Sequence, residues 1–245
     1  MKKYFILGQL IILTLIGSAQ KLQLTEAATE FRNNYNSSWI SIPDSTLRST
    51  QLAKNTPILL KAKKAIDESY TKQLQTPFVK SKDETKMHFY RGVIYLDYWI
   101  MSSYNASIFN EVSALGEEKM KEATFGSFSK CLELDIKKQW TSDVKNKMMT
   151  YRNQSINVGV DNFIKKNYEN AFSSFKMAIE MYNILSLTDT LAMINAALSS
   201  EKLKKTDEAF KYYKMCADNN YGKGAEMYQS MIRVLNANDT KDEDK

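Results

Sequence analysis

The chain repeats itself between Tyr151 and Tyr221. The segment from Asn157 to Asn183 aligns with the segment from Asn195 to Tyr221 when Ala171 is placed on Ala209. In this alignment, small and aromatic residues recur at matching positions: Gly159 with Ala197, Phe175 with Tyr213, and Ala178 with Cys216. Small residues at such a period allow two helices to approach closely, which indicates stacked helix-turn-helix repeats.

The composition and the charge pattern agree with a helical repeat. The 245 residues include only three prolines and eight glycines, which favours an all-α chain. A lysine pair, Lys165-Lys166, is followed by Glu169, and a second pair, Lys204-Lys205, is followed by Thr206-Asp207-Glu208. Positive charge suits a helix C-terminus and negative charge an N-terminus, so both places are predicted to be turns between helices.

The repeated residues resemble those of a tetratricopeptide repeat (TPR) protein. The 34-residue pattern of that family has a small residue in the first helix, then alanine, an aromatic residue and alanine in the second. Gly159, Ala171, Phe175 and Ala178 match one repeat, and Ala197, Ala209, Tyr213 and Cys216 match the next. The resemblance implies an all-α fold in which antiparallel helix pairs stack as a right-handed superhelix, an α-solenoid. Another helical-repeat family with these spacings is the alternative.

The period from Ala171 to Ala209 exceeds the TPR pattern by four. We assign the additional residues to a longer connection at Ser186–Thr190. The two repeats then occupy residues 141–221. Residues 222–245 form either a partial repeat or a capping helix, Ala225–Asn236, with a charged tail, and the array either ends there or continues in a longer protein.

Upstream of residue 141 the pattern is weaker. Residues 20–55 form an N-terminal helical segment, and the next helix begins near Ser45 or near Thr56-Pro57. The segment holds a helix at Leu22–Trp39, whose predicted contact face consists of Ala27, Phe31, Tyr35 and Trp39. Residues 56–140 are predicted to hold degenerate TPR-like helices. These comprise a second helix carrying Ala62, Ile66 and Ser69, a first helix at Thr85–Met101 with Gly92 at its contact, an irregular stretch at Ser102–Gly116, and a partner helix at Glu117–Asp135.

The N-terminus has the pattern of a signal peptide, residues 1–19. Lys2 and Lys3 precede an apolar run, Tyr4–Ile16, and Ala19 provides a small residue before a cleavage site at Gln20. This run is shorter than the roughly 20 residues that span a bilayer. We expect an exported protein, periplasmic or secreted, with no transmembrane span after cleavage. An uncleaved, buried first helix is the alternative.

No residue pattern indicates catalysis, so we predict that the chain is not an enzyme. The chain has one histidine, His88, and lacks a glycine-rich phosphate loop, a nucleophile elbow and a paired-histidine zinc motif. Neither a cofactor nor a metal is expected. The net charge is +6, but the basic residues are scattered among acidic ones and form no cluster, which argues against a nucleic-acid partner. Cys131 and Cys216 both fall in apolar helical patterns and are predicted to be free and buried.

The resemblance places any binding site on the first helices of the repeats, which line a concave groove in the TPR family. The corresponding residues here are Asn153, Ile156, Val160, Phe163, Leu191, Ile194, Leu198 and Glu201. Ile156 and Ile194 stand where some members carry a lysine that clamps a C-terminal carboxylate. We therefore expect a protein or peptide partner with an apolar or amphipathic segment. The alternative is a cell-envelope component that captures glycan, or assembles a surface complex, through exposed Tyr98, Trp99 and Tyr104.

Overall fold

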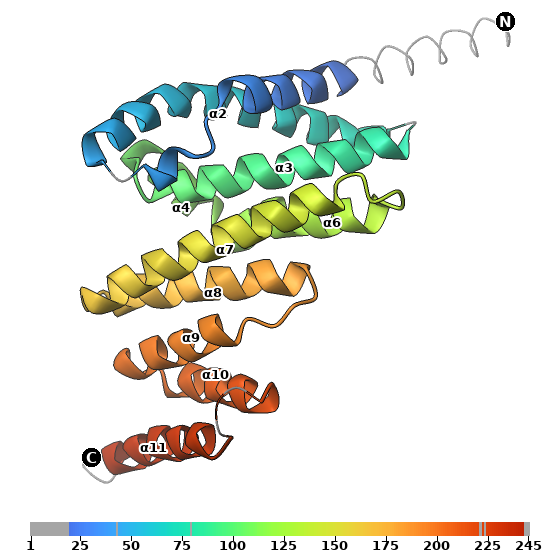
Figure 1. Ribbon diagram of the computed structural model, residues 1–245. Coiled ribbons are helices and arrows are strands. Elements are labelled where there is room, and N and C mark those ends of the chain that lie inside the picture. Colours follow the sequence, from blue (N-terminus) through green and yellow to red (C-terminus); the bar gives the residue numbers. More distant parts are fainter. Residues whose placement is uncertain (1–19, 43, 79, 221, 223, 243–245) are drawn as a thin grey trace, which may run out of the picture. The chain divides into compact units, whose positions relative to one another are not determined.

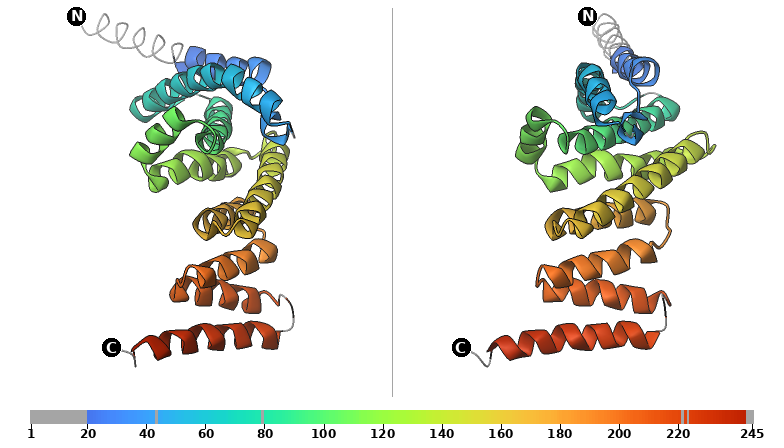
Figure 2. Two further views of the ribbon diagram at one scale, coloured as in Figure 1. Left: turned by 90° about the vertical axis from the view of Figure 1, so that its left-hand side faces the viewer. Right: turned by 60° about the vertical axis from the view of Figure 1, so that its left-hand side comes forward.

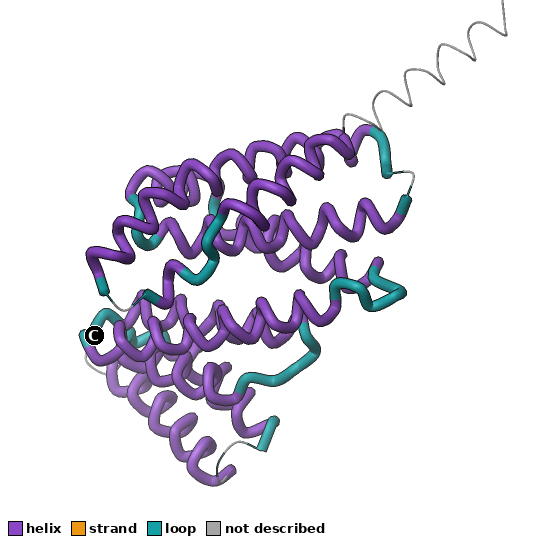
Figure 3. Tube along the Cα trace, turned by 45° about the horizontal axis from the view of Figure 1, so that its top comes forward, coloured by secondary structure: helices purple, strands orange, loops and turns teal. Residues whose placement is uncertain are grey.

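The computed structural model describes residues 20–42, 44–78, 80–220, 222 and 224–242, and all regular structure among them is helical (Figures 1 and 3). The prediction of an all-α chain is therefore confirmed. The predicted signal peptide lies outside the described residues. The chain divides into two compact units, residues 1–144 and 145–245. Among the described helices, none has both the length and the apolar character needed to cross a membrane.

The first unit begins with a helix that is shorter than predicted. Residues 20–29 are α-helical, the π-helix η1 (Glu30–Asn34) follows, and the backbone becomes extended at Tyr35. A short 3₁₀-helix, η2 (Trp39–Ser41), completes the segment. The predicted contact face is nevertheless buried, because each of its members has its side chain in the core: Ala27, Phe31, Tyr35 and Trp39.

Two long helices follow, α2 (Ser45–Gln75) and α3 (Ser81–Ser102). Helix α2 begins at the earlier of the two predicted positions, because the Asp44 carboxylate accepts a hydrogen bond from the backbone amide of Leu47 at 2.8 Å. Pro57 lies inside the helix rather than at its start. α2 therefore runs through the predicted boundary between residues 55 and 56.

Helix α3 pairs with α6 (Ser127–Leu134) across an insertion. A Cβ atom added to Gly92 of α3 would lie 3.0 Å from the ring of Phe128 in α6, which confirms that the two helices are partners. Between them lie α4 (Ala106–Leu115), α5 (Glu117–Lys121) and the π-helix η3 (Glu122–Gly126). The prediction of irregular structure at Ser102–Gly116 is wrong for α4, which Asn105 caps through bonds to two backbone amides.

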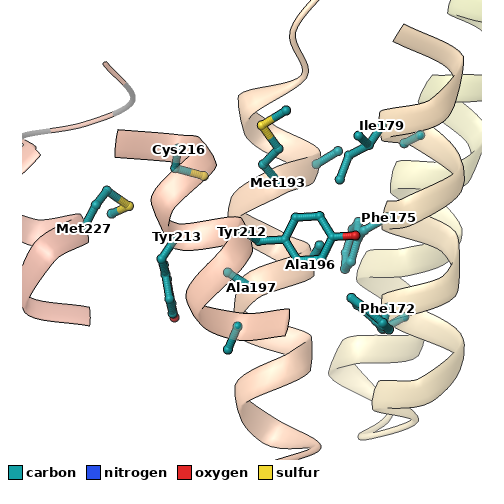
Figure 4. Close-up of a cluster of buried hydrophobic side chains, with 14 of the residues drawn as sticks. Phe172, Phe175, Ile179, Met193, Ala196, Ala197, Tyr212, Tyr213, Cys216 and Met227 are labelled. Carbon is teal, nitrogen blue, oxygen red and sulfur yellow. The ribbon is translucent and has the colours of Figure 1, made fainter. Parts of the chain in front are cut away.

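The second unit is a series of helices that contact one another in chain order. Helix α7 (Thr141–Ile164) crosses the boundary between the units, and α8 (Tyr168–Ile184), α9 (Thr190–Lys202), α10 (Thr206–Asp218) and α11 (Gly224–Asp242) follow it. α9 contacts α8 and α10, and α10 contacts α11. Figure 2 shows α8 to α11 as successive layers. Figure 4 shows the apolar cluster between them, where Phe172, Phe175, Tyr212 and Tyr213 lie.

The two predicted turns share one backbone geometry. In the α7–α8 turn, the amides of Lys165, Lys166, Asn167 and Ala171 bond the carbonyls of Asp161, Phe163, Asn162 and Asn167. The same four bonds recur at the aligned positions of the α9–α10 turn. Lys166 and Lys204 adopt matching left-handed conformations, with φ of 62° and 59°. The period that relates Ala171 to Ala209 in the sequence therefore also relates the two turns in the structure.

The additional four residues lie in a helix and not, as predicted, in a longer connection. Helix α8 has 17 residues and α10 has 13, whereas residues 185–189 and 219–223 form connections of equal length. The extra residues thus add about one turn to α8. From the start of α9 at Thr190 to the start of α11 at Gly224, the step has the length of the TPR pattern.

Four triplets with the same spacing lie in the core, one on each second helix. Every member is at most 1% exposed. The sequence analysis identified three of these triplets but missed the one in η3 and α6, because the insertion separates it from Gly92. The triplets are Ala62/Ile66/Ser69, Thr124/Phe128/Cys131, Ala171/Phe175/Ala178 and Ala209/Tyr213/Cys216.

Adding one methyl group at Gly159 should destabilise the second unit. A Cβ atom there would lie 2.6 Å from Cε1 of the fully buried Phe175. We expect Gly159→Ala to lower the free energy of unfolding by about 1–3 kcal/mol, and Gly159→Leu by more. Gly126→Ala is the matched control, because a Cβ atom there meets only Cγ of Glu122 at 3.8 Å. Equal denaturation midpoints for both alanine variants would contradict this packing.

The left-handed turn residues give a second test. A lysine in this conformation costs about 1 kcal/mol that glycine avoids. We therefore expect Lys204→Gly to raise the melting temperature, whereas Lys202→Gly, inside the last turn of α9, should lower it. Thermal unfolding followed by circular dichroism distinguishes the two. A loss of stability at position 204 equal to that at position 202 would show that the turn strain is absent.

Candidate functional site

The structure divides the predicted site residues between surface and core. Asn153, Val160 and Leu191 are exposed, with 38% of Val160 and 43% of Leu191 accessible. Phe163, Ile194 and Leu198 are partly buried and pack against the apolar cluster of the second unit. Ile156 is 8% exposed and belongs to that cluster, so its side chain is unsuited to direct contact with a partner.

Three apolar residues follow directly after the contact positions on the first helices, and two of them, Val160 and Ile232, are exposed. Successive residues on a helix are rotated by about 100°, so the neighbour of a buried contact lies at the edge of the interface. Val160 follows Gly159, Leu198 follows Ala197, and Ile232 follows Met231. Gly159 packs on Phe175, and Ala197 and Met231 are buried.

Helix α11 adds residues that the sequence analysis missed. Tyr228, Ile232 and Leu235 are 56%, 57% and 46% exposed, and they occupy the positions on α11 that Ile194, Leu198 and Glu201 occupy on α9. Met227, Met231 and Val234 hold the helix in place by burying its other face in the cluster. The sequence distance from α9 to α11, which matches the length of the TPR pattern, could have identified these residues. The match is hard to detect in the sequence because Met231 stands where the other first helices have a small contact residue.

We call six exposed residues of the first helices of the repeats the first-helix surface. It spans α7, α9 and α11, and its neighbours Asn157, Asn195 and Gln229 are polar but uncharged. The members of the first-helix surface are Asn153, Val160, Leu191, Tyr228, Ile232 and Leu235.

Glu201 joins α9 to the two helices that follow it. The Tyr213 hydroxyl of α10 donates to Oε2 of Glu201 at 2.7 Å, and Nη2 of Arg233 in α11 donates to the same oxygen at 3.0 Å. Burial raises the pKa of Glu201, but the bonds from Tyr213 and Arg233 outweigh burial and hold the pKa below the ordinary 4.5. Glu201 was predicted to line the groove, and it also anchors α11 beside α9.

A second ion pair fixes the start of α9. Nε and Nη2 of Arg152 in α7 donate to the two oxygens of Asp189 at 2.5 and 2.6 Å. Oδ1 of Asp189, which is almost fully buried, also accepts from the backbone amide of Ala192. This bidentate pair therefore sets the position of Leu191, two residues beyond Asp189.

The aromatic residues of the glycan alternative do not form one exposed platform. Tyr98 is fully buried, and Trp99 is half-buried, 6.0 Å from the ring of Phe125. Tyr104 is exposed, but its ring packs edge-on against Trp39 at 5.3 Å. Tyr98 therefore has no face available for a sugar.

The potentially reactive side chains are buried in inactive forms. Desolvation, aided by Arg91, lowers the pKa of His88 to about 4, which leaves the imidazole neutral at pH 7. Cys131 and Cys216 are free and buried, as predicted. Burial raises their pKa values to about 12 and about 11, so both thiols stay protonated. Within the described residues, no cluster of three metal-binding side chains occurs.

Comparisons of the chain with protein-family models, with curated proteins and with solved structures each gave no significant match.

The contact between Glu201 and Arg233 should make the docking of α11 depend on pH. Because the pKa of Glu201 is lowered in the folded state, its contribution to stability is present above the ordinary pKa and is lost as pH falls through the folded value. We expect Glu201→Gln to be less stable than the original chain at pH 7, with the difference shrinking as the pH falls below the ordinary carboxyl pKa of 4.5. Urea unfolding measures it.

Glu208→Gln is the control, because Glu208 is an exposed carboxylate in the same unit. A stability difference for Glu201→Gln that stays constant across the pH range would show that this carboxylate does not titrate at an altered pKa.

Proposed function

We propose that this chain is an exported scaffold of TPR-like helical repeats, which binds an apolar or amphipathic segment of another protein on the first-helix surface. The observation that carries the proposal is that three successive first helices each expose apolar side chains: Val160 on α7, Leu191 on α9, and Tyr228, Ile232 and Leu235 on α11. Of these, Val160 and Ile232 occupy the same position of the repeat.

The repeat architecture is supported by two independent regularities. The α7–α8 and α9–α10 turns share the same four backbone bonds, and the four buried triplets share one spacing. Such repeats stack because no helix pair can bury its own apolar face alone. Stacked pairs of this kind form the right-handed superhelix of the TPR family, and we infer the same arrangement for the second unit.

The chemistry of the first-helix surface favours an apolar partner. Its side chains are aliphatic or aromatic apart from Asn153, and the carboxylate of Glu201 is engaged by Tyr213 and Arg233. Exposed apolar side chains surrounded by polar ones are typical of protein interaction sites. Asn157, Asn195 and Gln229 would supply the polar rim with both donors and acceptors. An acidic C-terminal tail is a less suitable partner, because isoleucine occupies positions 156 and 194, where a lysine would be needed to bind its carboxylate.

Export is inferred from the sequence, since residues 1–19 have the pattern of a signal peptide. Gln20, the first residue after the predicted cleavage site, belongs to the packed part of the first unit. Its side-chain amide donates a hydrogen bond to Oε1 of Gln73 in α2 at 3.1 Å. A partner in the periplasm or outside the cell follows from this inference.

Two exposed residues provide the test of the binding surface. The mature chain, beginning at Gln20, is used to recover partners from the envelope fraction of its source cells, and partners are identified by mass spectrometry. We expect Leu191→Asp combined with Ile232→Asp to weaken binding of the purified partner by more than about tenfold, because both aspartates would be desolvated in the interface. Ile156 is left unchanged, since it belongs to the core.

Leu47→Asp is the control, because Leu47 is exposed on α2 of the other unit. Circular dichroism checks that each variant keeps its helical content. Unchanged affinity in the double variant, measured by titration calorimetry, would remove the first-helix surface as the binding site.

A further inference from the structure

A cavity of about 570 Å³ lies along α2 in the first unit. Leu60, Lys63, Lys64, Asp67, Glu68, Thr71, Lys72 and Gln75 of α2 line it, and Glu111 of α4 faces it from the other side. The volume falls within the range of small-molecule sites, about 300–1,000 Å³. None of these residues belongs to the first-helix surface, so the cavity is independent of the function proposed above.

The cavity exists because of the insertion between α3 and α6. Two tyrosines on adjacent turns of α3 each hold one carboxylate: Tyr95 donates to Asp67 of α2 at 2.6 Å, and Tyr98 donates to Glu111 of α4 at 2.5 Å. Burial raises the pKa of both tyrosines, so their hydroxyls remain donors. The Lys63 ammonium lies over both rings, 5.1 and 5.2 Å from their centroids. Helix α3 therefore holds both the α2 wall and the α4 wall of the cavity.

Most of the charges in the cavity are already satisfied by neighbours. Lys63 pairs with Asp67 at 2.8 Å, while Glu68 and Lys72 both bond the side chain of Gln23. Lys64 forms no ion pair or hydrogen bond with another described residue. Glu111 accepts the bond from Tyr98 but pairs with no cation in the described part of the chain. Among the described residues, Lys64 is therefore the ammonium of this cavity that has no acceptor, and Glu111, like Glu68, is a carboxylate without a counter-ion.

We propose that this cavity binds a small zwitterion, a free amino acid or a short peptide, with its carboxylate on Lys64 and its ammonium on Glu111. A ligand with charge of one sign would meet as many repelling as attracting groups, because three ammonium groups and three carboxylates line the walls. A zwitterion satisfies Lys64 and Glu111 at once. Thr71 and Gln75 offer further donors along the same face of α2.

Three forms of one dipeptide test the proposal on the mature chain. Alanyl-alanine carries both charges, N-acetyl-alanyl-alanine lacks the ammonium, and alanyl-alanine amide lacks the carboxylate. Titration calorimetry should detect the first, with each of the others bound about fivefold more weakly, as expected for partly exposed ion pairs. Equal affinity for all three, or no binding of alanyl-alanine up to about 10 mM, would overturn the proposal.

Charge-removing variants locate each end of the ligand. Lys64→Gln should weaken alanyl-alanine about fivefold but leave the amide unaffected, and Glu111→Gln should weaken alanyl-alanine but leave the acetylated form unaffected. Glutamine at position 111 can still accept the bond from Tyr98. Lys54→Gln, on α2 outside the cavity, should bind all three ligands as the original chain does. Binding that is insensitive to Lys64→Gln and to Glu111→Gln would place the ligand elsewhere.

Discussion

Helix pairs in both units depend on the contact between an aromatic ring on a second helix and a residue with almost no side chain on a first helix. Phe175 lies where a Cβ atom of Gly159 would be, and Phe128 leaves equally little room at Gly92. Both rings are fully buried, which contributes about 1.5–3 kcal/mol for each. Neither ring can move away, because the residues one turn before and one turn after it are also in the core.

That contact determines which residues are left for binding. Once Gly159 faces Phe175, the rotation of the helix places Val160 at the edge of the interface and Asn157 beside it. The same geometry recurs at Leu198 and Ile232. The first-helix surface is thus a consequence of core packing, and its apolar character is the part that packing does not explain. None of its five apolar residues belongs to a buried triplet, so each could have been polar without disturbing one.

Much of the fold could be predicted because periodicity reports burial directly. Ala27, Phe31, Tyr35 and Trp39 were assigned to the core by spacing alone and are buried, although the backbone changes from α-helix to π-helix among them. Local spacing does not report insertions, so α4 and the triplet at Thr124 were missed. It also misplaced Ile156, whose burial depends on contacts with a neighbouring helix. The cavity could not be predicted, because Asp67 and Glu111 are far apart in the sequence. Hydrogen bonds from Tyr95 and Tyr98 of α3 hold them in place.

The longer α8 has a consequence for how such an array can change its length. The added residues, 181–184, extend α8 beyond the position that matches the end of α10, and they lengthen the helix by about 6 Å. Met181, the first of them, is fully buried, so the added turn enlarges the core of the second unit. The two repeats therefore differ by about one turn of one helix, and that turn adds an apolar contact instead of a longer connection.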